Sequence, residues 1–147
     1  MRTKTLRIVY WVVTLLFVVP QAWSAVQYLT EAPRMAETIR HLGYPLYFMK
    51  ILAIAKILGI AAILYGRFPV LREWAYAGLT FDVLGAFLSH VSVGDSFLIA
   101  LVPLLFFVAQ LASYLLWKRL AREGAAPSST GERWAGREPL ARDVLPH

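Results

Sequence analysis

The sequence predicts an all-α integral membrane protein, a bundle of four membrane-spanning helices with both termini in the cytoplasm. Of its 147 residues, 59% are hydrophobic and only 16% are charged, and the mean hydropathy is +0.57. Soluble domains are less apolar and carry more charge. Four apolar segments account for the difference, and each has about the 20 residues that a helix needs to cross a bilayer. Such long, non-alternating runs argue against membrane-spanning strands. The segments cover roughly residues 8–29, 46–65, 74–93 and 97–117.

The first span, residues 8–29, follows a short basic start. Three basic residues precede it: Arg2, Lys4 and Arg7. The same pattern also fits a signal peptide, because the small residues around Ala25 resemble a cleavage site. The apolar run continues past that site to Leu29, which favours a span that is retained. Cleavage would leave three spans and would not invert the others.

The first connection, residues 30–45, is the longest, and part of it has the pattern of a short amphipathic helix. Pro33 suits the first turn of such a helix, and Gly43 suits the position just after its end. Three apolar side chains fall on one side: Met35, Ile39 and Leu42. A helix of this kind can lie on the outer membrane surface. The second span, residues 46–65, follows directly.

The third span, residues 74–93, and the fourth, residues 97–117, are separated by a very short connection and are expected to pack antiparallel. After Glu123 the composition changes to Gly, Pro, Ser and scattered charge, with no apolar period. We therefore expect one membrane domain over residues 1–122 and a disordered cytoplasmic tail over residues 123–147.

The basic residues predict the orientation of the spans. They precede the first span, separate the second from the third at Arg67 and Arg72, and follow the fourth from Lys118 onward. The other two connections carry no such excess, so the positive-inside rule places both termini in the cytoplasm. The net charge of +6 therefore reflects the ends of the spans, and no nucleic-acid partner is expected.

Two ionisable residues lie deep within predicted spans. Counted at about 1.5 Å per residue, Lys56 lies ~16 Å from the outer edge of the second span, and Asp82 lies ~15 Å from the inner edge of the third. The two helices run antiparallel, so the residues meet near the midplane, and we expect an ion pair. Charged groups at this depth are costly and usually have a partner or a function. The alternative is that the pair only fixes helix packing.

Small residues share faces with these two ionisable groups. Gly78, Gly85 and Ser89 lie on the same stripe of the third span as Asp82, and Gly59 lies on the same face of the second span as Lys56. Small residues at such spacing let a neighbouring helix approach closely. We therefore expect these four positions to serve helix packing.

A second polar layer is expected near the outer surface, where Lys50 and His90 lie. His41, Tyr44 and Tyr47 are close to Lys50 in the sequence. Such a cluster can bind a quinone headgroup, because a His or Lys donates to a carbonyl while aromatic rings cover the ring face. The alternatives are that Lys50 snorkels to the outer headgroups and that His90 is a packing histidine.

Several chemistries find no support in the sequence. There are no cysteines, which excludes disulfides, thiol nucleophiles and cysteine-ligated iron–sulfur clusters within this chain. A Gly-rich phosphate loop, an HExxH motif and a GxSxG motif are all missing. We expect no metal site, and the sequence leaves open whether the protein has any enzymatic activity.

Seven segments, taken in order and spacing, resemble the DoxX-like family. They are residues 10–17 (YWVVTLLF), 28–33 (YLTEAP), 41–48 (HLGYPLYF), 56–64 (KILGIAAIL), 72–82 (REWAYAGLTFD), 85–90 (GAFLSH) and 112–117 (ASYLLW). The resemblance covers the predicted membrane unit and not the tail. It implies a small multi-pass protein of the bacterial inner membrane with four helices. It also implies kinship with subunits of a thiosulfate:quinone oxidoreductase, with membrane partners in oxidative-stress complexes, and with assembly factors.

The leading hypothesis for function is therefore a membrane subunit or partner in a redox or oxidative-stress complex. Such a subunit would contact quinone, with Lys50, Lys56, Asp82 and His90 as its polar site. A second hypothesis is a non-enzymatic membrane chaperone or scaffold, and a third is a small transporter or proton path along Lys56 and Asp82. The expected partners are the lipid bilayer and another protein or a second copy of this chain.

Overall fold

The computed structural model describes residues 3–125, and these residues form five helices. In chain order they are α1 (Thr3–Leu29), α2 (Pro33–His41), α3 (Tyr47–Tyr65), α4 (Pro69–Ser92) and α5 (Phe97–Ala125). The described part contains no strand, so the all-α prediction is confirmed. The number of helices is five rather than four, because the amphipathic segment in the first connection forms the separate helix α2.

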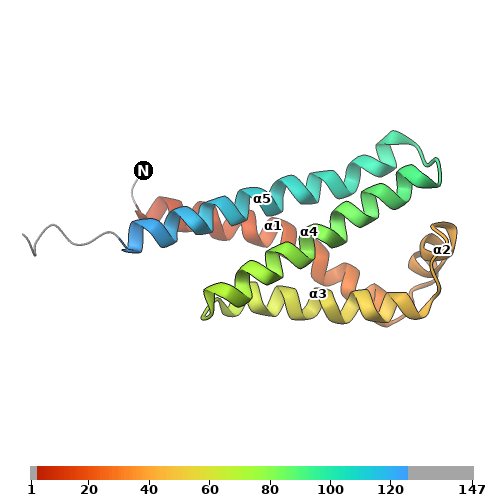
Figure 1. Cartoon of the computed structure of the whole chain (residues 1–147), viewed down its shortest axis with the longest axis horizontal. Coiled ribbons are helices and arrows are strands. Elements are labelled where there is room, and N and C mark those ends of the chain that lie inside the picture. Colours follow the sequence, from red (N-terminus) through yellow and green to blue (C-terminus); the bar gives the residue numbers. More distant parts are fainter. Residues whose placement is uncertain (1–2, 126–147) are drawn as a thin grey trace, which may run out of the picture.

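The four long helices pack side by side. Both α1 and α4 pack against α3 and against α5, while α2 packs against α1. Thr3 and Ala125, the two ends of the described chain, lie at one end of the molecule, which we call the terminal end (Figure 1). Helix α2 and the α4–α5 turn lie at the opposite end, which we call the α2 end (Figure 1).

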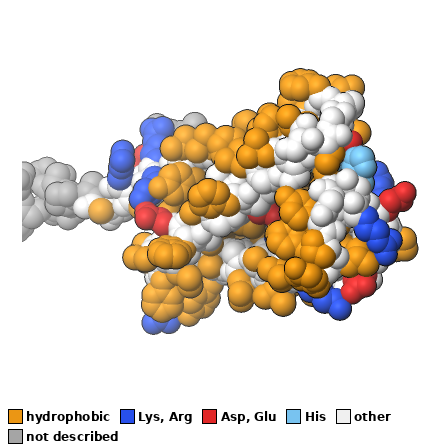
Figure 2. Space-filling model, turned by 45° about the vertical axis from the view of Figure 1, so that its right-hand side comes forward, with side chains coloured by type: hydrophobic (Ala, Val, Ile, Leu, Met, Phe, Trp, Pro, Cys, Tyr) orange, Lys and Arg blue, Asp and Glu red, His pale blue; other side chains and the backbone are white. Residues whose placement is uncertain are grey.

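Three of the helices are long and apolar enough to cross a membrane: α1, α3 and α5. This agrees with three of the predicted spans. Helix α4 does not reach the same hydropathy, because Asp82 and His90 lie within its apolar stretch. Figure 2 shows hydrophobic side chains over the middle of the visible face and charged side chains gathered toward the two ends.

The helices continue beyond the apolar runs that define the expected spans. Helix α4 begins at Pro69, because a proline fits the first turn of a helix, and α5 continues to Ala125. Helix α3 ends at Tyr65. The next residue, Gly66, has a φ of 62°, a left-handed conformation that glycine adopts without strain. Of the tail predicted over residues 123–147, residues 123–125 belong to α5, and the remainder lies outside the described residues.

The largest hydrophobic core lies between the long helices. Its buried aromatic side chains come from three helices and include Tyr10, Phe17, Tyr76 and Trp117. A smaller cluster under α2 contains Ala36, Ile39 and Met49. The second cluster is why α2 rests on the bundle: Ile39 is 2% exposed and Met49 is fully buried.

Candidate functional site

The structure brings Lys56 and Asp82 together in the middle of the molecule. The Lys56 ammonium donates to Asp82 Oδ2 at 2.6 Å and to Gln21 Oε1, also at 2.6 Å. The side chains of Lys56 and Asp82 are 7% and 16% exposed. Helices α1, α3 and α4 therefore meet at one buried ammonium group, and the expected contact between Lys56 and Asp82 is present.

Gln21 is a partner that the depth argument missed. It lies on α1, is 5% exposed, and shares a helix face with Tyr28, two turns away. The Tyr28 ring lies 5.6 Å from the Lys56 ammonium, within reach of a cation–π contact. The sequence signal for both was their spacing, because polar residues seven positions apart share one face of a helix. Because the ammonium has three N–H groups, two acceptors leave one for a further contact.

A cavity of about 520 Å³ lies beside the ion pair, between α3 and α4. We call it the α3–α4 groove. All of its lining residues come from α3 and α4, and they are mostly apolar, with Lys56 and Asp82 among them. Its largest apolar lining side chains are Leu52, Leu58, Leu71, Trp74, Leu79 and Phe81. A charged pair thus borders an apolar space large enough for a small ligand.

A second cavity, of about 150 Å³, lies on the α2 side of the same pair. We call it the α2 cavity. It shares four lining residues with the groove: Leu52, Lys56, Phe81 and Asp82. Helix α2 and the turn after it, residues 33–46, are here called the α2 segment. Ile39 and Leu42 from this segment also line the cavity, together with the polar side chains of Tyr28, Tyr44 and Ser89. The ion pair therefore borders two cavities, and the second also has three hydroxyl groups in its lining.

The glycines expected to mediate close helix packing divide into two kinds. A Cβ atom built at Gly59 would lie 3.3 Å from Leu79 Cγ, so α4 does approach α3 closely there. Cβ atoms at Gly78 and Gly85 would meet nothing within 4 Å. Within the described chain no other helix packs against these two positions, because the stripe of α4 that carries them borders the cavities.

Lys50 does not join His90, as the expected outer cluster requires. Its ammonium lies 2.9 Å from Glu31 Oε1, and the two side chains are 58% and 45% exposed. The Lys50 ammonium lowers the pKa of the Glu31 carboxyl through a hydrogen bond and through its charge. Lys50 therefore belongs to an exposed ion pair at the α2 end and lines neither cavity.

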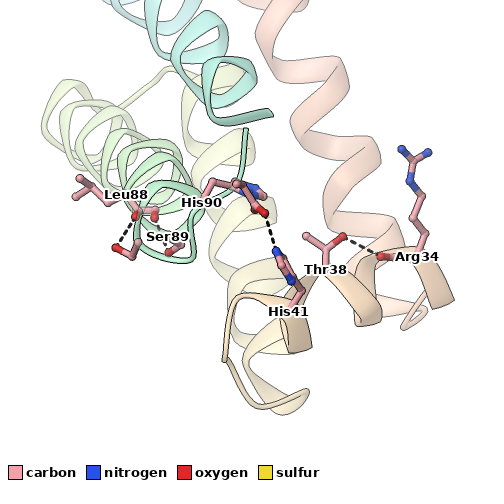
Figure 3. A network of polar contacts seen from close by, with 9 residues as sticks. Arg34, Thr38, His41, Leu88, Ser89 and His90 are labelled. Carbon is pink, nitrogen blue, oxygen red and sulfur yellow. Dashed lines mark hydrogen bonds and ion pairs between the residues drawn. The ribbon is translucent and has the colours of Figure 1, made fainter. Parts of the chain in front are cut away.

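His90, in the last turn of α4, lies in a separate polar cluster around Asp95, and Asp95 belongs to the α4–α5 turn. Its Nδ1 is 2.6 Å from Asp95 Oδ2, while His41 Nε2 is 2.7 Å from Asp95 Oδ1. Figure 3 shows His41 reaching from the end of α2 toward the turn that follows His90. Hydrogen bonds from His90 and then from His41 lower the pKa of the Asp95 carboxyl. Ser89 adds a link from α4 to the α2 segment through the Tyr44 hydroxyl, at 2.9 Å.

The expected outer cluster is therefore only partly assembled. His41, His90 and Tyr44 come together at the α2 end, but Lys50 does not, and Tyr47 is 66% exposed. His90 lines neither the groove nor the α2 cavity. Among residues 3–125, no group of three or more acidic or histidine side chains is placed to hold a metal ion.

A further polar network joins α1, α4 and α5 nearer the terminal end. The Ser113 hydroxyl lies 2.6 Å from that of Thr14 and 2.8 Å from that of Tyr76. Gln110 donates to the Tyr76 carbonyl at 2.8 Å and to the Thr80 hydroxyl at 2.6 Å. These contacts hold the three helices together and pair most of the polar groups in this part of the interior, although Gln110 Oε1 has no hydrogen-bond partner.

Comparison with known proteins places the site within a family. A family model described as the DoxX-like family matches residues 12–113. The match covers more than half of the chain and includes Lys56, Asp82 and His90. No curated protein and no solved structure matches this chain. The chain belongs to the DoxX-like family.

Proposed function

We propose that this DoxX-like chain crosses the bacterial inner membrane four times, with both termini in the cytoplasm and residues 1–122 as its membrane domain. Three apolar helices and the family support membrane residence. Helix α4 supplies the fourth span. The terminal end carries the α3–α4 turn with Arg67 and the basic end of α5 with Lys118, which supports a cytoplasmic position for that end.

The two ionisable groups within the apolar stretch of α4 are compatible with a span because each has a partner within the protein. Asp82 pairs with Lys56, and His90 contacts Asp95. An ionisable group that faces the protein interior and is paired there costs far less in a membrane than one that faces lipid. The low hydropathy of α4 therefore reflects its inward side and does not argue against a membrane position.

Within this topology, the chain binds a quinone in the α3–α4 groove. The observation that carries the proposal is the buried Lys56–Asp82 pair beside an apolar cavity of about 520 Å³. The remaining N–H of Lys56 can donate to a quinone carbonyl, and the second carboxylate oxygen of Asp82 can accept from a quinol hydroxyl. The apolar walls suit an isoprenoid tail. The candidate contact therefore moves from His90 to Lys56.

The chain then acts as the quinone-holding membrane subunit of a redox or oxidative-stress complex. In this role it needs a protein partner, which supplies the redox centre. The opposing hypothesis is a membrane scaffold in which the same ion pair only fixes the packing of α1, α3 and α4. The two hypotheses differ in whether a ligand occupies the groove.

The test is mass spectrometry of quinones and lipids extracted from the detergent-purified protein, with bulk membrane as the reference. We expect quinone enriched in the wild type and lost in Lys56→Met. A second variant, Gly78→Leu, fills the groove from a position with open space around it and leaves the ion pair intact. Lys50→Met is the matched control, because Lys50 lies outside both cavities and should keep the quinone.

Circular dichroism of each variant establishes that the helices remain folded. Quinone that is absent from the wild type, or retained in both Lys56→Met and Gly78→Leu, would overturn the proposal and favour the scaffold. Enrichment of a different lipid that Gly78→Leu removes would keep the groove as a binding site but reject quinone as its ligand.

A further inference from the structure

We propose that the α2 cavity is a gated route by which water and protons reach Asp82 from the outer membrane surface, and that the α2 segment is its gate. This inference rests on the proposed membrane topology, which places the α2 end outside. It concerns the exchange of water and protons at the ion pair, whatever molecule occupies the α3–α4 groove.

The two cavities that meet at the ion pair differ in the side chains beyond it. The groove continues between the apolar side chains of α3 and α4. The α2 cavity continues toward the α2 end past Tyr28, Tyr44 and Ser89, which offer three hydroxyl groups. Water enters a cavity only where polar partners hold it. The α2 cavity is therefore the side from which Asp82 is hydrated.

The α2 segment forms the cover of this cavity. Ile39 near the end of α2, and Leu42 and Tyr44 just after it, are the residues that this segment contributes to the lining of the cavity. Met49 and Ile39 anchor α2 through the small hydrophobic cluster beneath it. Apolar packing therefore anchors α2 itself. The end of α2 and the turn that follows, residues 40–44, lie beyond this packing, and we call them the free edge of the cover.

Two polar contacts hold that free edge against α4 and the α4–α5 turn. One joins His41 to Asp95, and the other joins Tyr44 to Ser89. We call these two contacts the latch, and Figure 3 shows its His41 side. The His41 side chain is 54% exposed, and Tyr44 is 38% exposed. Exposed polar contacts contribute little to stability and open readily, as expected for a segment that moves.

The chain has no cysteine, so a single introduced thiol reports on one position without a background. Gly85 lines the α2 cavity and Gly78 lines the groove, and both have open space for a side chain. We compare Gly85→Cys and Gly78→Cys in intact cells and in inverted vesicles, using a charged maleimide that does not cross membranes. Detergent-denatured samples confirm that each thiol is reactive.

We expect the maleimide to label Gly85→Cys from the outer side and to leave Gly78→Cys unlabelled from both sides. Adding His41→Ala to Gly85→Cys should speed labelling about fivefold, the factor expected for the loss of one net hydrogen bond. Arg40→Ala is the matched control, because Arg40 is exposed on the same helix and takes no part in the latch. It should leave the labelling rate unchanged.

The other outcomes separate this inference from the proposed function. Labelling of Gly85→Cys from the inner side would reject the proposed topology and the route with it. A thiol that stays unlabelled from both sides, with and without His41→Ala, would overturn the route while leaving quinone binding to its own test. Equal acceleration by His41→Ala and Arg40→Ala would reject the latch.

Discussion

Removing the Lys56 ammonium should be among the most costly single changes in this protein. In Lys56→Met the chain keeps a side chain of similar length but loses the charge and both hydrogen bonds of the ammonium, each of 2.6 Å. Asp82 then keeps a carboxylate in a largely buried position without its cation. The change therefore removes one partner of a buried pair and leaves the other uncompensated.

The exposed fractions of the two side chains set the size of the expected loss in the free energy of unfolding. Breaking a buried ion pair by removing one partner costs about 3–5 kcal/mol. Asp82 is 16% exposed and borders two cavities, so we expect the low end, about 3 kcal/mol, for Lys56→Met and a similar loss for Asp82→Leu. Because replacing a whole buried pair by apolar groups is often nearly neutral, the double variant should lose only about 1 kcal/mol.

The assay is unfolding of the detergent-solubilised protein by sodium dodecyl sulfate, followed by far-ultraviolet circular dichroism. The four proteins of the double-mutant cycle give the coupling energy between the two positions, which the losses expected above set at about 5 kcal/mol. The exposed pair formed by Lys50 and Glu31 is the control. Lys50→Met should leave the free energy of unfolding unchanged within error, because water screens that pair.

Additive losses would refute the reasoning. If the double variant lost as much as the sum of the single variants, to within about 0.5 kcal/mol, Lys56 and Asp82 would not interact in the folded protein. A loss in Lys50→Met as large as that in Lys56→Met would show that burial does not decide the energetics of these pairs.

Three further predictions concern the rest of the site. The pKa of Asp95, followed by the carboxyl carbon shift in NMR, should lie below its ordinary value of 3.8 and rise in His90→Ala, since the hydrogen bond from His90 is the largest cause of the lowering. The stabilisation from this cluster is then present above the ordinary pKa and is lost as the pH falls through the lowered pKa. An Asp95 pKa that is unchanged in His90→Ala would contradict this prediction. Gly85→Ala should raise the free energy of unfolding by up to about 1 kcal/mol because alanine favours the helix and the Cβ has room. Gly59→Val should lower the free energy of unfolding, because a side chain there meets Leu79. Changes of the same sign in both variants would contradict the close approach of α4 to α3 at Gly59. Ser113→Ala should cost about 0.5–2 kcal/mol in the same assay, because it removes a hydroxyl that contacts two helices, and a neutral result would mean that water replaces the network.

The sequence indicated the depth of the central pair but not its surroundings. Counting residues along two antiparallel spans placed Lys56 and Asp82 at one level, and the structure joins them at 2.6 Å. The same count gave no reason to choose Gln21 over other polar residues of the first span. It also gave no sign that the pair borders two cavities, because a cavity is enclosed by side chains from several helices at once.

Near the α2 end, a similar position along the spans did not lead to contact. Lys50 and His90 were expected together, yet Lys50 pairs with Glu31, and His90 contacts Asp95. Similarly, the small-residue stripe of α4 was expected to meet a helix, but Gly78 and Gly85 have open space beside them. Both differences concern which way a side chain points.

The sequence by itself determined the all-helical class of the protein and the position of its long apolar segments, because hydropathy and a fixed rise of about 1.5 Å per residue decide these. Only the tertiary structure decided which polar groups are partners and where the cavities lie. Those features depend on the tilt and the rotation of each helix about its own axis. Both are set by the packing of all neighbouring side chains and not by any single segment.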